Sequence, residues 1–162
     1  MPGWKRVFPF KGPAGVSLVE MMVVMALIGL LTGMAVPNIR KHLPAYRLNA
    51  QARQIMTDIH YARGRAASLN REYRIEFDIN TQVYVVKQGD KSNGSTTWTP
   101  DKSVPVRKEK GIVIVSVSSN PVWIKPAGTM AGTTITVQNA EGESIVITAS
   151  FVGRIKKSPI IR

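Results

Sequence analysis

The sequence KGPAGVSLVEMMVVMALIGLLTGMAVPNIRK, residues 11–41, contains an apolar run that has no equal in the rest of the chain. No charged residue lies between Glu20 and Arg40, so the stretch from Met21 to Ile39 is uncharged. As a helix that rises about 1.5 Å per residue, this stretch would span roughly 28 Å, close to the hydrocarbon thickness of a bilayer. The sequence therefore predicts one membrane-spanning helix near the N-terminus.

Glu20 is not explained by the two common kinds of N-terminal membrane signal. A secretory signal peptide has an apolar core of about 7 to 15 residues, and this run is longer. A plain signal anchor accounts for the length and for the basic flank of Lys5, Arg6 and Lys11. It leaves the acid unexplained, because an ionised carboxylate beside an apolar run costs on the order of 2 to 3 kcal/mol unless it is paired. Glu20 therefore predicts a cation supplied by a partner.

The segment GVSLVE and the apolar run after it resemble the processing signal of type IV prepilins and type II secretion pseudopilins. In that family a prepilin peptidase in the membrane cuts after the glycine and methylates the new amine. The resemblance implies a leader over residues 1–15 that ends at Gly15, and a mature N-terminus at Val16, where phenylalanine or methionine is usual. It implies a transmembrane helix over residues 16–39. It also implies that Glu20 pairs with the terminal ammonium of a neighbouring subunit when the helices pack into a filament.

The composition sets limits on the part of the chain beyond the apolar run. The chain has 162 residues, 22 of them basic and 10 acidic, for a formal net charge of +12. The leader carries three of the basic residues, so its removal lowers the net charge to +9. The absence of cysteine excludes disulfides, thiolate nucleophiles and sulfur-ligated metal sites. About 110 to 120 residues remain beyond the predicted membrane helix, enough for one domain with a single core.

The domain begins with helical periodicity and changes to strand periodicity near residue 72. Apolar residues at three- and four-residue intervals predict a helix from about residue 45 to 70 with one buried stripe, which consists of Ile55, Met56, Ile59, Ala62, Ala66 and Leu69. Alternating or continuous apolar segments then predict antiparallel strands over residues 72–79, 81–88, 111–118, 122–126, 133–138 and 144–150. Residues 89–105, rich in Gly, Ser, Thr and Pro, predict a long exposed loop. The predicted fold is α+β, with a long N-terminal helix packed on antiparallel sheet.

Two further segments are similar to one group within this family. Residues 52–78, ARQIMTDIHYARGRAASLNREYRIEFD, resemble the end of the helix and the first strand of the GspH/FimT group. The segments WIKPAG at 123–128 and ESIVITASFVGRIKK at 143–157 resemble its closing region. The resemblance implies a pilin-like minor subunit of a type II secretion pseudopilus or a type IV pilus. It further implies a single-pass inner-membrane protein with residues 40–162 in the periplasm, whose partners are prepilin peptidase and other pilins or pseudopilins in a periplasmic or surface filament.

The sequence offers no pattern of an enzyme or of a cofactor protein. His42 and His60 have no second ligand or acid partner at a characteristic spacing. Phosphate-binding loops, nucleophile elbows and zinc-binding helix motifs are absent from the sequence. We therefore expect no catalytic activity, no cofactor and no metal.

The C-terminal tail GRIKKSPIIR, residues 153–162, supports an alternative function. Four basic residues occur there without an acid, namely Arg154, Lys156, Lys157 and Arg162. The Gly-Arg pair at its start resembles the segment that carries DNA binding in FimT-like minor pilins. The competing interpretation is a solvated basic terminus, because basic residues are spread over the whole domain. If the tail binds DNA, the contacts should go mainly to phosphates and weaken steeply with salt.

Overall fold

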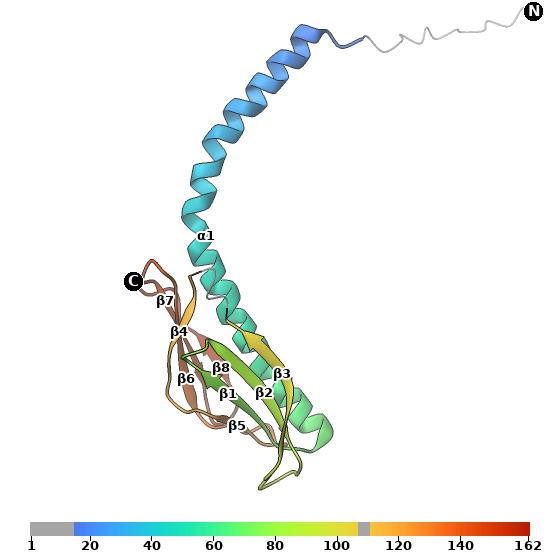
Figure 1. The fold of residues 1–162 in the computed structure, drawn as a ribbon, viewed down its shortest axis with the longest axis vertical. Coiled ribbons are helices and arrows are strands. Elements are labelled where there is room, and N and C mark those ends of the chain that lie inside the picture. Colours follow the sequence, from blue (N-terminus) through green and yellow to red (C-terminus); the bar gives the residue numbers. More distant parts are fainter. Residues whose placement is uncertain (1–14, 107–110) are drawn as a thin grey trace, which may run out of the picture. The chain divides into compact units, whose positions relative to one another are not determined.

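The computed structural model describes residues 15–106 and 111–162, apart from the side chains of residues 34–41. One long helix, α1 (Leu18–Leu69), is followed by a series of antiparallel strands (Figure 1). The chain divides into two compact units, Met1–Arg40 and Lys41–Arg162. Helix α1 contributes its first part to one unit and its second part to the other.

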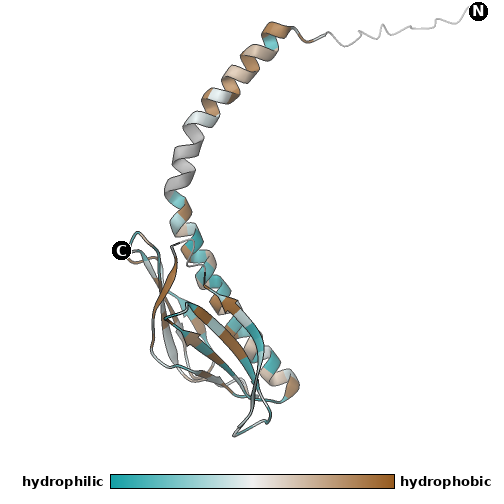
Figure 2. Cartoon of the chain, in the orientation of Figure 1, coloured by the Kyte–Doolittle hydropathy of each residue, from teal (hydrophilic) through white to brown (hydrophobic). Residues whose placement is uncertain are grey.

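The first unit consists of the beginning of α1. All described side chains from residue 15 to 33 are exposed, and most of them are apolar (Figure 2). In the part of the chain that the structure describes, no helix reaches both the length and the apolarity of a membrane span. Residues 34–39 of the predicted span have side chains outside the described ones, so the transmembrane helix over residues 16–39 stays a prediction.

The second unit contains two four-stranded antiparallel sheets. The first sheet has the order β3-β2-β1-β5, and its strands are β1 (Tyr73–Asp78), β2 (Val83–Gly89), β3 (Trp98–Pro105) and β5 (Val122–Ile124). The second has the order β4-β6-β7-β8, and its strands are β4 (Val113–Val117), β6 (Thr133–Gln138), β7 (Ser144–Ala149) and β8 (Ile155–Lys157). Along β1 and β6, more buried residues alternate with less buried ones, as expected for strands with one face in a core.

The core lies between the second part of α1 and the two sheets. Four members of the predicted helical stripe are completely buried, namely Ile55, Ile59, Ala62 and Ala66. They pack with the inward residues of β1, of which Tyr73, Ile75 and Phe77 were expected from the strand periodicity. The prediction of a helix packed on antiparallel sheet is therefore confirmed. Two residues at the ends of these patterns are exposed, because Leu69 is the last residue of α1 and Ile79 follows the end of β1.

Two strands lie where the sequence did not predict them. Strand β3 lies inside residues 89–105, which were predicted to be a loop, and β8 lies in the basic tail. Strand β3 is an edge strand that pairs only with β2, so it needs little apolar alternation, and an edge tolerates Pro100 and Pro105, which lack a backbone donor. Strand β8 is short and is defined by its pairing with β7.

Candidate functional site

The predicted processing site lies immediately before α1. Gly15, Val16 and Ser17 precede the helix and are exposed, and a backbone hydrogen bond joins Met21 N to Ser17 O at 3.2 Å. A Cβ added at Gly15 would meet no described atom within 4 Å, and the backbone there is not left-handed. The described part of the chain therefore gives no structural reason for a glycine at this position.

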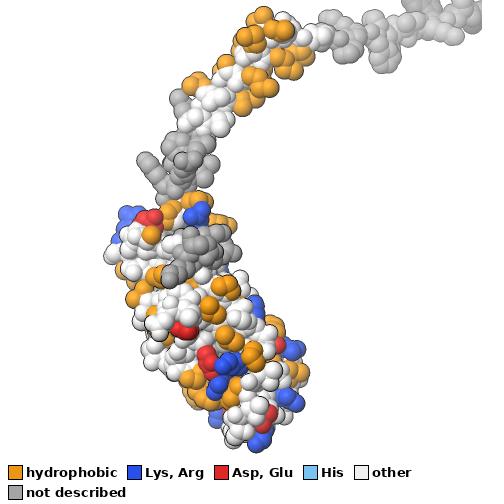
Figure 3. Space-filling model, in the orientation of Figure 1, with side chains coloured by type: hydrophobic (Ala, Val, Ile, Leu, Met, Phe, Trp, Pro, Cys, Tyr) orange, Lys and Arg blue, Asp and Glu red, His pale blue; other side chains and the backbone are white. Residues whose placement is uncertain are grey.

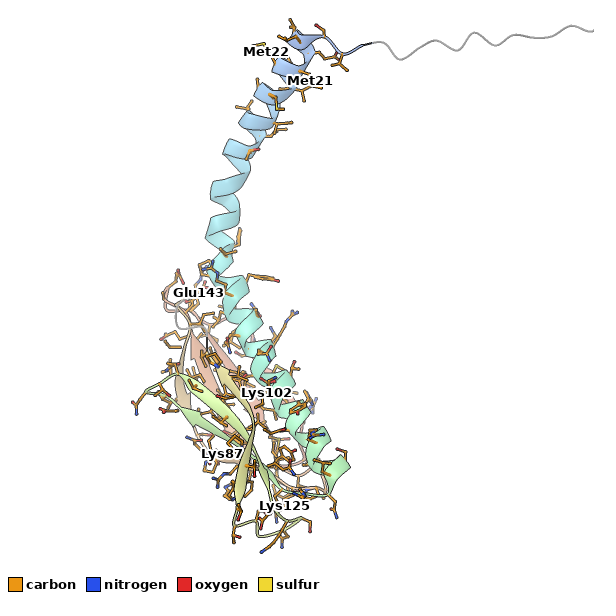
Figure 4. All side chains as sticks on the ribbon, turned by 45° about the vertical axis from the view of Figure 1, so that its right-hand side comes forward. Met21, Met22, Lys87, Lys102, Lys125 and Glu143 are labelled. Carbon is orange, nitrogen blue, oxygen red and sulfur yellow. The ribbon has the colours of Figure 1, made fainter. Side chains whose placement is uncertain are left out.

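Glu20 is the acidic residue of the first turn of α1. A carboxylate is favourable there because the helix N-terminus carries a partial positive charge. Among the described residues, no Lys or Arg nitrogen lies within 4.0 Å of its carboxylate. The described chain thus leaves Glu20 exposed, beside apolar neighbours such as Met21 and Met22 (Figure 4).

The four basic residues predicted for DNA binding do not form one group. Arg154 and Lys156 are exposed, whereas the Nζ atom of Lys157 donates a hydrogen bond to Asn49 Oδ1 of α1 at 2.5 Å. The register explains the division, because Lys157 pairs with the buried Ile147 and Lys156 with the exposed Thr148.

Arg162 is also engaged with the domain. Its Nε donates to Glu143 Oε1 at 2.9 Å, and this bond, together with one from Asn139, lowers the pKa of the Glu143 carboxyl. On the face shown in Figure 3, Lys and Arg side chains occur at several separate places over the domain. The tail therefore presents only Arg154 and Lys156 as free basic groups within the described residues, and its DNA binding stays a prediction.

A buried acid that the sequence analysis missed joins α1 to the first sheet. The Asp58 carboxylate is almost completely buried, and it accepts hydrogen bonds from Tyr84 Oη of β2 at 2.6 Å and from Lys102 Nζ of β3 at 2.5 Å. Burial raises the pKa of the Tyr84 phenol well above its ordinary value, and the bond to Asp58 raises it further. The sequence carried one signal that this acid is buried, namely its position within the apolar stripe, directly before Ile59. These contacts hold the edge strand β3 against the helix.

A second missed contact ties two loops to α1. The Arg63 guanidinium donates to Gly128 O at 3.1 Å through Nε and to Gly153 O at 2.7 Å through Nη1. Gly153 has a φ of 82°, and a Cβ there would lie 2.3 Å from the guanidinium. The glycine of the Gly-Arg pair therefore has a structural role, because it leaves room for the Arg63 guanidinium.

The described residues offer no metal centre. Within residues 15–106 and 111–162, no three His, Asp or Glu side chains gather closely enough to hold an ion. The polar clusters around Asp58 and Glu143 are internal contacts of the domain, satisfied by Tyr84, Lys102 and Arg162.

Comparisons with known families match most of the chain. Residues 51–153 match the model of the type II transport protein GspH, and residues 11–36 match the prokaryotic N-terminal methylation motif. A search of curated proteins gave no match.

Solved structures share the fold at low sequence identity. The minor pseudopilin EpsH from the type II secretion system of Vibrio cholerae has a TM-score of 0.57 at 13% identity, over 69% of this chain and 96% of its own. The type IV minor pilin FimU of Pseudomonas aeruginosa has a TM-score of 0.54 at 18% identity, over 69% and 93%. The solution structure of Escherichia coli GspH has a TM-score of 0.55 at 16% identity, over 70% and 88%.

Proposed function

This chain belongs to the GspH family of type II transport proteins, and we propose that it acts as a minor pseudopilin or pilin, a structural subunit of a type II secretion pseudopilus or a type IV pilus. The observation that carries the proposal is the order of the two matches. A methylation motif over residues 11–36 precedes the GspH match over residues 51–153 in one chain. The first supplies a means of assembly and the second supplies the domain that is assembled.

The surroundings of Gly15 support processing at this residue. The described residues do not require a glycine there, since a Cβ would meet open space among their atoms. A peptidase that cuts after residue 15 requires an accessible, extended segment, and residues 15–17 are exposed and precede the helix. Cleavage would place a new ammonium at Val16, four residues before Glu20.

Glu20 then has a role in assembly. Within the described residues of one chain its carboxylate has no basic side chain within ion-pair distance. In an apolar environment an unpaired carboxylate is costly, and a terminal ammonium from a neighbouring subunit removes that cost. The exposed apolar side chains of α1 pack against neighbouring helices or lipid at the same time. The protein is anchored in the inner membrane before assembly, with its domain in the periplasm, and it has no catalytic role.

Intact mass tests the processing step. Co-production with an active prepilin peptidase should remove residues 1–15, a loss of about 1.6 kDa at roughly 110 Da per residue, and should add a methyl group to the Val16 amine. The variant Gly15→Arg should keep the full mass, whereas Gly33→Ala, also in open space, should be processed normally. A wild-type chain that keeps Met1 beside an active peptidase would overturn the proposal.

The variant Glu20→Ala tests assembly separately. We expect normal processing and membrane insertion, and a loss of filament incorporation of about tenfold or more, because the partner ammonium is left unpaired. The measurement is the fraction of tagged subunit that is recovered in sheared filaments. Incorporation equal to that of the wild type would show that Glu20 has no pairing role.

A further inference from the structure

A shallow apolar hollow lies at the end of the domain where α1 finishes. It measures about 280 Å³, and its lining residues are Trp123, Lys125, Thr129, Met130, Ala131 and Phe151. Figure 4 labels Lys125 at this end of the domain. We call this feature the end hollow. Its volume is below the range of about 300 to 1,000 Å³ that is typical of small-molecule sites, and it suits one or two side chains.

The walls of the end hollow are held in place by hydrogen bonds. Met130 N donates to Phe151 O at 3.1 Å, and Ala131 N donates to Trp123 O at 2.8 Å. The Arg63 guanidinium binds Gly128 O in one wall and Gly153 O in the hairpin that carries the other. A preformed site loses little conformational entropy when a partner binds.

The end hollow also leaves large apolar side chains in solvent. Trp123 is 40% exposed and Phe151 is 68% exposed, and the adjacent Val152 is 80% exposed. Trp123 and Phe151 line the hollow itself, and Val152 lies on the same tight hairpin, closed by a bond from Gly153 N to Ser150 O. Clustered exposed apolar groups of this kind mark interaction sites, and tryptophan is frequent among the residues that dominate binding energy.

The charges around the end hollow define the partner. None of its six lining residues is acidic, and Lys125 is one of them. The Arg74 guanidinium lies 5.7 Å from the centre of the Trp123 ring, and the exposed Arg154 follows the Phe151 hairpin. The carboxylate beside Arg74 is Glu76, which also binds Lys87 and so adds no net negative charge. A second copy of this chain would bring like charges together, which opposes self-association.

We propose that the end hollow receives a bulky apolar side chain, flanked by carboxylates, from a neighbouring filament subunit. This inference rests on the proposed function. The apolar side chain packs against Trp123 and Phe151, and the flanking carboxylates face Lys125 and Arg154. The Arg63 hydrogen bonds connect both walls of the end hollow to the second part of α1.

The test is site-specific photo-crosslinking in filaments of the full-length protein. A photoreactive phenylalanine analogue at Phe151, which is exposed and outside the core, should crosslink to another filament subunit. Mass spectrometry should map the crosslink to a bulky apolar residue with an Asp or Glu within about three positions. Lys125→Glu should reduce this crosslink at least threefold, whereas Arg53→Glu, an exposed charge reversal on α1, should leave it unchanged.

A second photoreactive position distinguishes failure of this inference from failure of the proposed function. The analogue at Met25, in the exposed apolar part of α1, reports filament incorporation itself. Loss of the Met25 crosslinks would refute the proposed function. The docking proposal alone would be overturned if the Met25 crosslinks are retained and Phe151 gives no crosslink. The same conclusion holds if Phe151 crosslinks to a second copy of this chain, to a protein outside the filament or to a basic surface.

Discussion

The two parts of α1 treat apolar side chains in opposite ways. In the first part, residues 18–33, large apolar side chains such as Ile28, which is 52% exposed, have no partner within the described chain. In the second part, Ile59 and its neighbours along the stripe are completely buried against the sheets. One continuous helix thus contains apolar side chains that are buried in the folded domain and apolar side chains that stay exposed in the described chain. The hydrophobicity of a helix segment therefore does not by itself indicate whether its apolar side chains are buried within the same chain.

The largest expected difference between the two parts of α1 is in the free energy of unfolding of a matched pair of side-chain truncations. Ile59→Ala should lower the free energy of unfolding of the domain by about 3 kcal/mol, because it leaves a cavity in the core. Ile28→Ala removes the same atoms from an exposed site and should change that free energy by less than about 0.5 kcal/mol. Urea unfolding of the full-length protein in detergent, followed by tryptophan fluorescence, measures both. Equal effects of the two variants would mean that the two parts of α1 do not differ as described.

Asp58 tests whether the second part of α1 also depends on polar contacts. Asp58→Asn should destabilise the domain by about 2 kcal/mol, because Lys102 loses its buried ion-pair partner and Tyr84 loses a charged acceptor. The control is Asp101→Asn, whose carboxylate accepts an exposed bond from Tyr61 and should matter by less than about 0.5 kcal/mol. The same urea titration applies. A neutral Asp58→Asn variant would leave the contact between β3 and the helix to apolar packing alone.

The raised pKa of Tyr84 gives this contact a pH dependence. Above the ordinary phenol pKa of 10.0 the unfolded chain loses the proton while the folded chain keeps it, so the folded state binds more protons and the free energy of unfolding falls as pH rises. Between pH 10 and 11 the wild type should lose about 1 kcal/mol more than Tyr84→Phe does. The exposed Tyr46→Phe should follow the wild type. Parallel curves for all three proteins would contradict the role of the Tyr84 proton.

The smallest expected effect applies the same contrast to adjacent lysines of β8. Lys157→Gln should destabilise the domain by about 0.5 to 1 kcal/mol through its lost bond to Asn49, and the exposed Lys156→Gln by almost nothing. DNA affinity should show the reverse order if the tail binds phosphates. The double variant Arg154→Gln with Lys156→Gln should then reduce the slope of log affinity against log salt concentration by about one to two. Lys157→Gln should leave that slope unchanged. Equal slopes for all variants would assign any DNA binding to general charge.

Local periodicity explains which parts of the fold the sequence predicted. The helical stripe around Ile59 and the alternation from Tyr73 to Phe77 follow from intervals of three, four and two residues, which sequence displays directly. The spacing from Gly15 to Glu20 is equally local, and residues 11–36 match the methylation motif. Strand β3 was wrongly predicted as a loop because an edge strand buries one face incompletely and so lacks the apolar alternation of a central strand.

The sequence by itself determined the type of chain, an apolar N-terminal segment with one acid followed by a helix and antiparallel strands, because these features depend on neighbouring residues. Only the tertiary structure decided which polar groups meet. Asp58 reaches Lys102 across 44 positions, and Arg63 reaches Gly128 across 65 and Gly153 across 90. It also left Lys156 exposed while Lys157 contacts α1, and it placed Trp123 and Phe151 in the lining of one hollow. Contacts over such separations depend on how strands pair and on which face each residue lies, and no local interval in the sequence encodes them.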